Sequence, residues 1–108
     1  MSEPKKITGV LRILFTASAT SAINIIQYYP TLADAKGNTS PQNFPENFGS
    51  KTIIISPADD TAWTIWRDNG IRCSGQTDIA NSAGGLTFSL DDAFSSDTTT
   101  YANIIIFN

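Results

Sequence analysis

The sequence predicts an all-β domain in which two strand-rich units pack face to face as a β-sandwich. β-branched and small polar residues dominate, and only 16% of the 108 residues are charged, which favours strands and turns over helices. Short segments that alternate apolar and polar residues are separated by polar turns with glycine or proline. Two of these segments, Ile53–Ile55 and Ile104–Ile106, contain the same isoleucine triplet. Units of this size cannot bury an apolar face alone, so they are expected to pair.

The first half of the chain is expected to hold three strands. Val10–Phe15 and Ala22–Tyr28 alternate apolar and polar residues, as half-buried strands do. Pro30 ends the second strand because proline cannot donate a hydrogen bond to the ladder. Residues 30–49 are polar and contain glycine and proline, so they are predicted to form a long loop. Thr52–Ser56 is the third expected strand.

The second half is expected to hold four strands, which are Ala62–Arg67, Ile71–Gln76, Leu86–Leu90 and Tyr101–Phe107. Asn69-Gly70 predicts a tight hairpin turn between the first two, because this pair accepts positive φ angles at little cost. Asp91–Phe94 is expected to form one helical turn with its acidic residues at the N-terminus.

Composition and charge disfavour several classes of partner and location. The formal net charge is −3 and the cations are scattered, so no basic patch is available for nucleic acid. No apolar run is long enough to span a bilayer, and the polar start of the chain lacks a secretory segment. The lone cysteine, Cys73, allows no internal disulfide and favours a reducing compartment. A cytoplasmic location without membrane partners is therefore expected.

The two halves of the chain match one another weakly at an offset of about fifty residues. Val10–Phe15 aligns with Ala62–Trp66, and the isoleucine triplets align as well. This match predicts a short lead at residues 1–9 and one domain at residues 10–108. The domain is divided into motifs at about 10–56 and 61–108. An accidental match is the alternative, since isoleucine, serine and threonine are common here.

Each half contains a similar hexapeptide directly before a strand, Glu46–Lys51 and Ser96–Tyr101. Their second residues are Asn47 and Asp97, and their fifth residues are Ser50 and Thr100. These positions resemble the calcium signature of the βγ-crystallin superfamily, whose domain is two Greek-key motifs packed as a β-sandwich. The chain is similar to a divergent, single-domain member of the microbial or fungal type.

The resemblance implies a calcium site with the ligands Glu46, Asn47, Ser50, Asp97 and Thr100. Both hexapeptides depart from the signature at their first and sixth positions, and Lys51 adds a cation beside one site. Calcium prefers six to eight oxygen ligands, so a set with few carboxylates predicts weak binding or none. The alternative is that these residues are ordinary turn formers ahead of strands.

The residues that would support catalysis are scarce. The chain has no histidine, which is the commonest general base near neutral pH. Cys73 therefore lacks a histidine partner that would activate it. The acidic pairs Asp59-Asp60 and Asp91-Asp92 are interpreted as turn and cap residues, because neighbouring side chains on a strand point to opposite faces. We expect a protein that is not an enzyme and has no cofactor beyond weak calcium.

Trp63 and Trp66 lie three positions apart, so on a strand they would face opposite sides. One is expected in the core, while the other could stack on a sugar ring; alternatively, both lie buried under loops. The leading hypothesis is a structural or stress-type βγ-crystallin-like protein. A carbohydrate-binding module or lectin and a small microbial toxin or inhibitor are the alternatives. A glycan and a second copy of the chain are the candidate partners.

Overall fold

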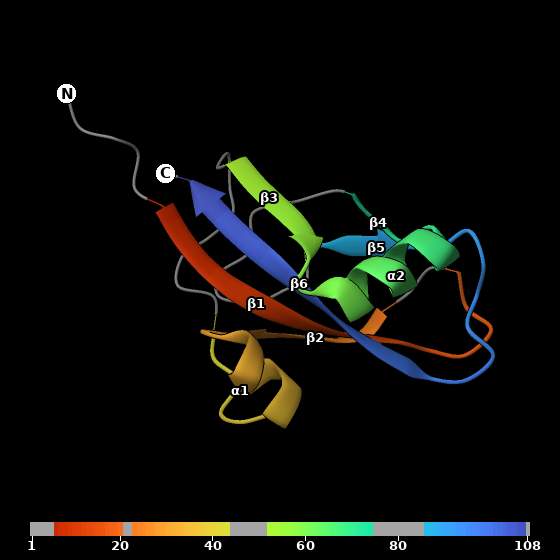
Figure 1. The fold of residues 1–108 in the computed structure, drawn as a ribbon, viewed down its shortest axis with the longest axis horizontal. Coiled ribbons are helices and arrows are strands. Elements are labelled where there is room, and N and C mark those ends of the chain that lie inside the picture. Colours follow the sequence, from red (N-terminus) through yellow and green to blue (C-terminus); the bar gives the residue numbers. More distant parts are fainter. Residues whose placement is uncertain (1–5, 21–22, 44–51, 75–85, 108) are drawn as a thin grey trace.

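A computed structural model describes residues 6–20, 23–43, 52–74 and 86–107 of the chain. It is a β-rich fold with antiparallel sheets and two helices among these residues (Figure 1). The elements are β1 (Lys6–Phe15), β2 (Ile23–Tyr29), α1 (Leu32–Gly37), β3 (Thr52–Pro57), α2 (Asp60–Asn69), β4 (Arg72–Ser74), β5 (Thr87–Ser89) and β6 (Thr98–Phe107). None of the described helices is long and apolar enough to cross a membrane.

The main sheet has four antiparallel strands in the order β2-β1-β6-β3. Its two central strands pair over their whole length, from Lys6–Phe107 to Phe15–Thr98. The strand β3 pairs with only part of β6 and ends at the pair Pro57–Ala102. The short strands β4 and β5 form a separate two-stranded sheet. The sheet therefore leaves one stretch of β6 without β3 beside it.

One face of the main sheet, here called the inner face, carries the larger hydrophobic core. Leu11 and Ile13 of β1 are fully buried there, and Ile104 of β6 is 1% exposed. The helix α2 supplies Trp66 to this core and β5 supplies Phe88. Fully burying one such side chain contributes about 1.5–3 kcal/mol, so this face is the main source of stability.

The opposite face, here called the outer face, carries a smaller cluster beneath α1. Val10 and Tyr29 of the sheet pack against Ala35 of the helix. The Tyr29 hydroxyl donates to the side-chain oxygen of Gln27 at 3.0 Å and also hydrogen-bonds to Asn38. Asn38 is the residue that ends α1, in a left-handed conformation with φ of 50°. Tyr29 thereby fixes the end of α1 to the sheet.

The expected strand Ala62–Arg67 is wrong, because these residues belong to α2. The Asp59 side chain caps the start of the helix by accepting a hydrogen bond from the Ala62 N–H at 2.8 Å. Gly70 ends the helix with φ of 65°, so Asn69-Gly70 is a helix terminus and not the hairpin turn that we expected.

The correction to α2 also removes one part of the expected repeat. Val10–Phe15 lies in a strand while its counterpart, Ala62–Trp66, lies in a helix, so the two segments do not share a structure. The isoleucine triplets do correspond in type, because both lie in strands. They are direct partners in the sheet: Ile53 pairs with Ile106 and Ile55 with Ile104.

Several other predictions can be compared with the described elements. The strands expected at Val10–Phe15, Thr52–Ser56 and Tyr101–Phe107 are confirmed, although β1 already begins at Lys6. The long loop expected from residue 30 is wrong in its first part, where α1 forms. The helical turn expected at Asp91–Phe94 is also absent.

Candidate functional site

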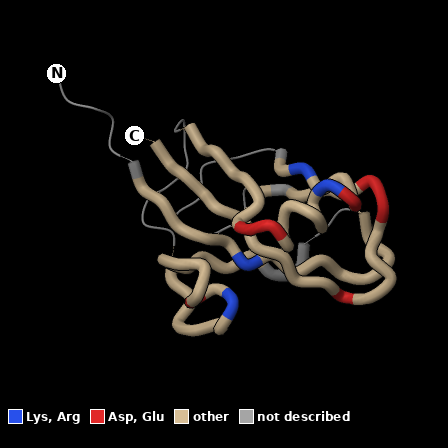
Figure 2. The backbone as a smooth tube through the Cα atoms, in the orientation of Figure 1, with Lys and Arg blue, Asp and Glu red and all other residues tan. Residues whose placement is uncertain are grey.

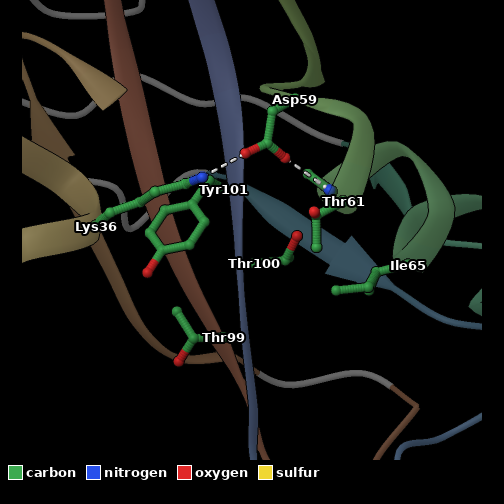
Figure 3. Close-up of a pocket in the computed structure, with 8 residues that line it drawn as sticks. Lys36, Asp59, Thr61, Ile65, Thr99, Thr100 and Tyr101 are labelled. Atoms are coloured by element: carbon green, nitrogen blue, oxygen red, sulfur yellow. Dashed lines mark hydrogen bonds and ion pairs between the residues drawn. The ribbon is translucent and has the colours of Figure 1, made fainter. Parts of the chain in front are cut away.

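A small pocket of about 160 Å³ opens where β3 leaves the sheet and α2 begins (Figure 3). It is lined by one residue from α1, the residues that start α2, and the first half of β6. The lining residues are Lys36, Asp59, Thr61, Ala62, Ile65, Thr99, Thr100 and Tyr101. Three segments that are distant in the sequence therefore meet at this pocket.

The open edge of β6 forms one side of this pocket. The pairing of β3 with β6 ends at Pro57–Ala102, and the next contact is a hydrogen bond from the Ala58 N–H to the Tyr101 carbonyl at 3.2 Å. In an antiparallel ladder, backbone groups two residues apart point to the same side. The N–H and C=O of Thr99 therefore face the same edge, where the described part of β3 offers no strand partner. This edge can supply backbone donors and acceptors to a ligand.

Lys36 and Asp59 form an ion pair at the mouth of the pocket. The Lys36 Nζ lies 2.6 Å from the Asp59 Oδ2, while the Asp59 Oδ1 accepts from the Ala62 N–H (Figure 3). The hydrogen bond from Lys36, followed by the one from Ala62, holds the pKa of Asp59 below its usual range. Asp59 is therefore a carboxylate at neutral pH, and its charge is balanced by the Lys36 ammonium group.

Thr100 carries the most unusual polar group of the site. The residue is 1% exposed, and its Oγ1 has no hydrogen-bond partner among the described residues. In Figure 3 this oxygen points toward Thr61 and the start of α2. A buried hydroxyl without a partner costs about 1–3 kcal/mol. A polar ligand atom that reached Thr100 would recover part of this free energy.

The described lining of the pocket offers hydroxyl groups, one ammonium group and one carboxylate. Its hydroxyl groups lie beside a carboxylate that is already bonded twice and whose lowered pKa makes it a weak base. Cys73 lies outside the lining, on β4. Burial raises the pKa of its thiol to about 11, so little thiolate forms near neutral pH.

Two of the predicted calcium ligands, Asp97 and Thr100, lie among the described residues. Glu46, Asn47 and Ser50 lie outside the described residues. Asp97 is exposed, and its Oδ1 accepts a hydrogen bond from the Ala17 N–H at 2.9 Å, which ties two loops together. Thr100 instead lies in the pocket. Within the described ranges, no group of three or more Cys, Asp or Glu residues is placed to hold a metal ion.

One tryptophan is exposed and the other is buried, as the first of the two interpretations of this pair expected. Trp63 is 56% exposed on α2, whereas Trp66 is 8% exposed and packs edge-on against Phe88 at 6.0 Å between ring centroids. The reason was wrong, because the two side chains diverge around a helix and not across a strand. Neither tryptophan lines the pocket.

The acidic pairs serve different local purposes. Acidic residues gather at the start of α2 and in the loop between β5 and β6 (Figure 2). Asp59 caps α2, whereas the sequence had suggested that Asp59-Asp60 forms the tip of a turn. Asp91 pairs with Arg72 across 2.7 Å, and both side chains are more than half exposed. These carboxylates support local structure.

Comparison of the chain with models of protein families, with curated proteins and with solved structures finds no match. The site therefore has to be interpreted from its own geometry. Sequence reasoning singled out Thr100 for calcium and missed Lys36, Thr61 and Thr99. One signal was available: Asp59 followed by a helix-compatible segment and then Gly70 marks the two ends of a helix.

Proposed function

We propose that this protein is a non-enzymatic binding protein whose pocket at the start of α2 holds a small polar ligand. The observation that carries the proposal is the buried Thr100, a lining residue of the pocket whose Oγ1 lacks a hydrogen-bond partner among the described residues. Such a group is expected at a place where a ligand completes the hydrogen bonding. The bonded carboxylate and the absence of an activated nucleophile at the pocket support binding without chemistry.

Amide chemical-shift mapping with a fragment collection tests this proposal. Fragments that bind are expected to shift the amide signals of Thr61 and of Thr99–Tyr101 in the wild-type protein. Thr100→Val, which keeps the shape and removes the hydroxyl, should weaken these shifts. Thr64→Val is the matched control, because Thr64 lies on α2, as Thr61 does, but outside the pocket lining. The proposal fails if no fragment of any charge shifts the pocket amides.

A second candidate is the structural or stress-type protein that resembles the βγ-crystallins, with two Greek-key motifs and weak calcium binding or none. The hydrogen bond between Asp97 and Ala17 favours it, because the one acidic calcium ligand that is described is engaged in closing a loop. Strand pairing measured by NMR in solution would test the Greek-key arrangement. The helix at Asp60–Asn69 occupies the place of a strand on which that arrangement was based.

The remaining alternatives are each supported by one exposed side chain at most. A lectin that stacks a sugar on a tryptophan would have to use Trp63, since Trp66 is buried. Self-association could use Ile54, an apolar side chain on the outer face of β3 that is 47% exposed. A toxin or inhibitor role remains a prediction that a growth assay with the purified protein can test.

A further inference from the structure

We infer that β3 pairs with β3 of a second copy of this chain, so that two main sheets join edge to edge in a symmetric dimer. This inference is independent of the pocket and of its proposed ligand. It follows from three properties of β3, which are its place at the edge of the sheet, the direction of its free backbone groups, and the near symmetry of its sequence.

The strand β3 lies at one edge of the main sheet. The strand order is β2-β1-β6-β3, and no described strand pairs with the free edge of β3, the side away from β6 (Figure 1). An edge strand presents unpaired N–H and C=O groups, and proteins commonly protect such an edge with charged side chains. The six residues of β3 include three consecutive isoleucines and no charged residue. This edge is therefore suited to pairing with another strand.

The hydrogen bonding with β6 determines which residues of β3 face the free edge. The Ala58 N–H donates to the Tyr101 carbonyl at 3.2 Å, so the N–H of residue 58 points toward β6. Backbone groups alternate in direction along an antiparallel strand, so those of Ile53, Ile55 and Pro57 point away from β6. Proline has no N–H and is tolerated at such an edge position. Ile53 and Ile55 therefore each offer an N–H and a C=O to a partner strand.

One antiparallel register pairs the edge groups of both isoleucines. In this register Ile53 pairs with Ile55 of the second copy, and the two Ile54 residues lie opposite each other on the two-fold axis. The central pair is of the type without hydrogen bonds, in which the Cα atoms are only about 4.5 Å apart and the side chains are closest. Ile54 is 47% exposed in the single chain, so the contact removes apolar surface from water.

The sequence of β3 favours a second copy over an unrelated strand. Around Ile54 the residues are Thr52-Ile53 on one side and Ile55-Ser56 on the other, so the segment is nearly symmetric. In the register above, Thr52 lies opposite Ser56 of the second copy, and cross-strand hydroxyl pairs are favourable. Since β3 carries no charge, the two strands bring no like charges together. Such self-complementarity is what a symmetric interface requires.

The first test is sedimentation velocity over a concentration series of the wild type, Ile54→Lys and Trp63→Lys. The series reaches about 1 mM, because a single pair of short strands is a small interface and contacts below about 1,200 Å² are typical of transient complexes. Trp63 is the matched control, since it is also an exposed apolar side chain, 56% exposed, but lies on α2. Circular dichroism of each variant shows whether it has folded.

The second test determines the register by disulfide formation in a Cys73→Ala background, which removes the native thiol. Thr52→Cys mixed with Ser56→Cys should form a cross-linked dimer, because the opposed Cα atoms are about 4.5 Å apart. Each of these variants alone places its two thiols about 13 Å apart, which is too far for a disulfide. Ile54→Cys should link to its own copy, and Trp63→Cys is the control for random collision.

The inference is supported by a wild type that dimerises with concentration, a dissociation constant raised about tenfold or more in Ile54→Lys and unchanged in Trp63→Lys, and preferential linkage of the Thr52→Cys and Ser56→Cys mixture. A wild type that stays monomeric up to about 1 mM would overturn it and leave the edge to a strand of another kind. Dimerisation that is lost only in Trp63→Lys, or thiols that link equally in all variants, would place the interface elsewhere and also overturn it.

Discussion

The Lys36 ammonium group lies 2.6 Å from the Asp59 carboxylate, which connects α1 on the outer face of the sheet to the start of α2 on the inner face. The two residues are separated by β3 along the chain and meet beside the open edge of β6. The pair also fixes the Asp59 side chain in its capping position. One contact thus joins both helices and forms the mouth of the pocket.

This ion pair predicts a pH dependence of stability. The pKa of Asp59 in the folded protein lies below its ordinary value of about 3.9 because of Lys36 and the Ala62 N–H. A lowered folded pKa stabilises the protein fully above the ordinary value, and the contribution is lost as pH falls through the folded pKa. Asp59→Asn keeps a helix cap but removes the charge. Its cost should be about 0.5–1 kcal/mol at neutral pH and should vanish in acid.

Urea unfolding of the wild type and Asp59→Asn across a pH series measures this difference. Lys36→Met is the matched control, because it removes the partner and retains most of the side-chain length. A difference between wild type and Asp59→Asn that stays constant down to strongly acid pH would show that the ion pair contributes nothing.

Gly9 provides a packing test of the fold. A Cβ atom at this position would collide with the ring of Tyr28, whose hydroxyl donates to the Thr8 carbonyl at 3.1 Å. Gly9→Ala should therefore lower the free energy of unfolding by about 1–3 kcal/mol, the usual cost of overpacking. Gly37→Ala is the control: its Cβ would meet only the Thr39 hydroxyl at 3.0 Å, and alanine favours the helix. Thermal unfolding that ranks the two variants equally would contradict the packing at Gly9.

Thr100→Val gives a stability test that needs no ligand. Removing a buried hydroxyl that has no partner should raise the free energy of unfolding by about 1 kcal/mol, because the desolvation cost disappears. Thr64→Val on the exposed side of α2 should change stability by less than about 0.5 kcal/mol. Chemical denaturation compares the two. A marked loss of stability in Thr100→Val would mean that the hydroxyl is bonded within the free protein.

Calcium is expected to change little. If a weak site existed with a dissociation constant near about 10⁻³ M, a tenfold excess of calcium would add about 1.4 kcal/mol. For a chain of this length, each kcal/mol raises the melting temperature by about 4–8 °C. A thermal melt with calcium, and with magnesium as the control, should show no such increase. A rise of this size that is lost in Asp97→Ala would instead establish a working site.

Much of the sheet could be predicted from local alternation. In β1, Leu11, Ile13 and Phe15 alternate with outward residues such as Arg12, so its buried face could be predicted. The strand β6 could be predicted from its β-branched, apolar end.

The helix α2 was missed because its sequence fits both structures. Ala62, Ile65 and Trp66 have the spacing of a helix face, but the segment also alternates in a way that suits a strand. The capping residues Asp59 and Gly70, which lie at the two ends of the segment, are the features that favour the helix over the strand.

The pocket could not be read from any single stretch of sequence. Lys36 comes from a helix expected to be loop, Thr61 from a helix expected to be a turn and strand, and Thr99 from a strand that begins earlier than predicted. Their meeting depends on where β3 stops pairing with β6, which is a property of the sheet register. Thr100 was singled out for calcium, and its burial beside the pocket was not predicted.

A crystal structure of the chain grown with a polar fragment that shifts the pocket amides tests the central claim most directly. The account predicts the fragment in the pocket, with one of its polar atoms within hydrogen-bond distance of the Thr100 Oγ1 and the Lys36–Asp59 pair still formed. A structure in which the Thr100 hydroxyl bonds to a protein group and the fragment lies elsewhere would contradict it.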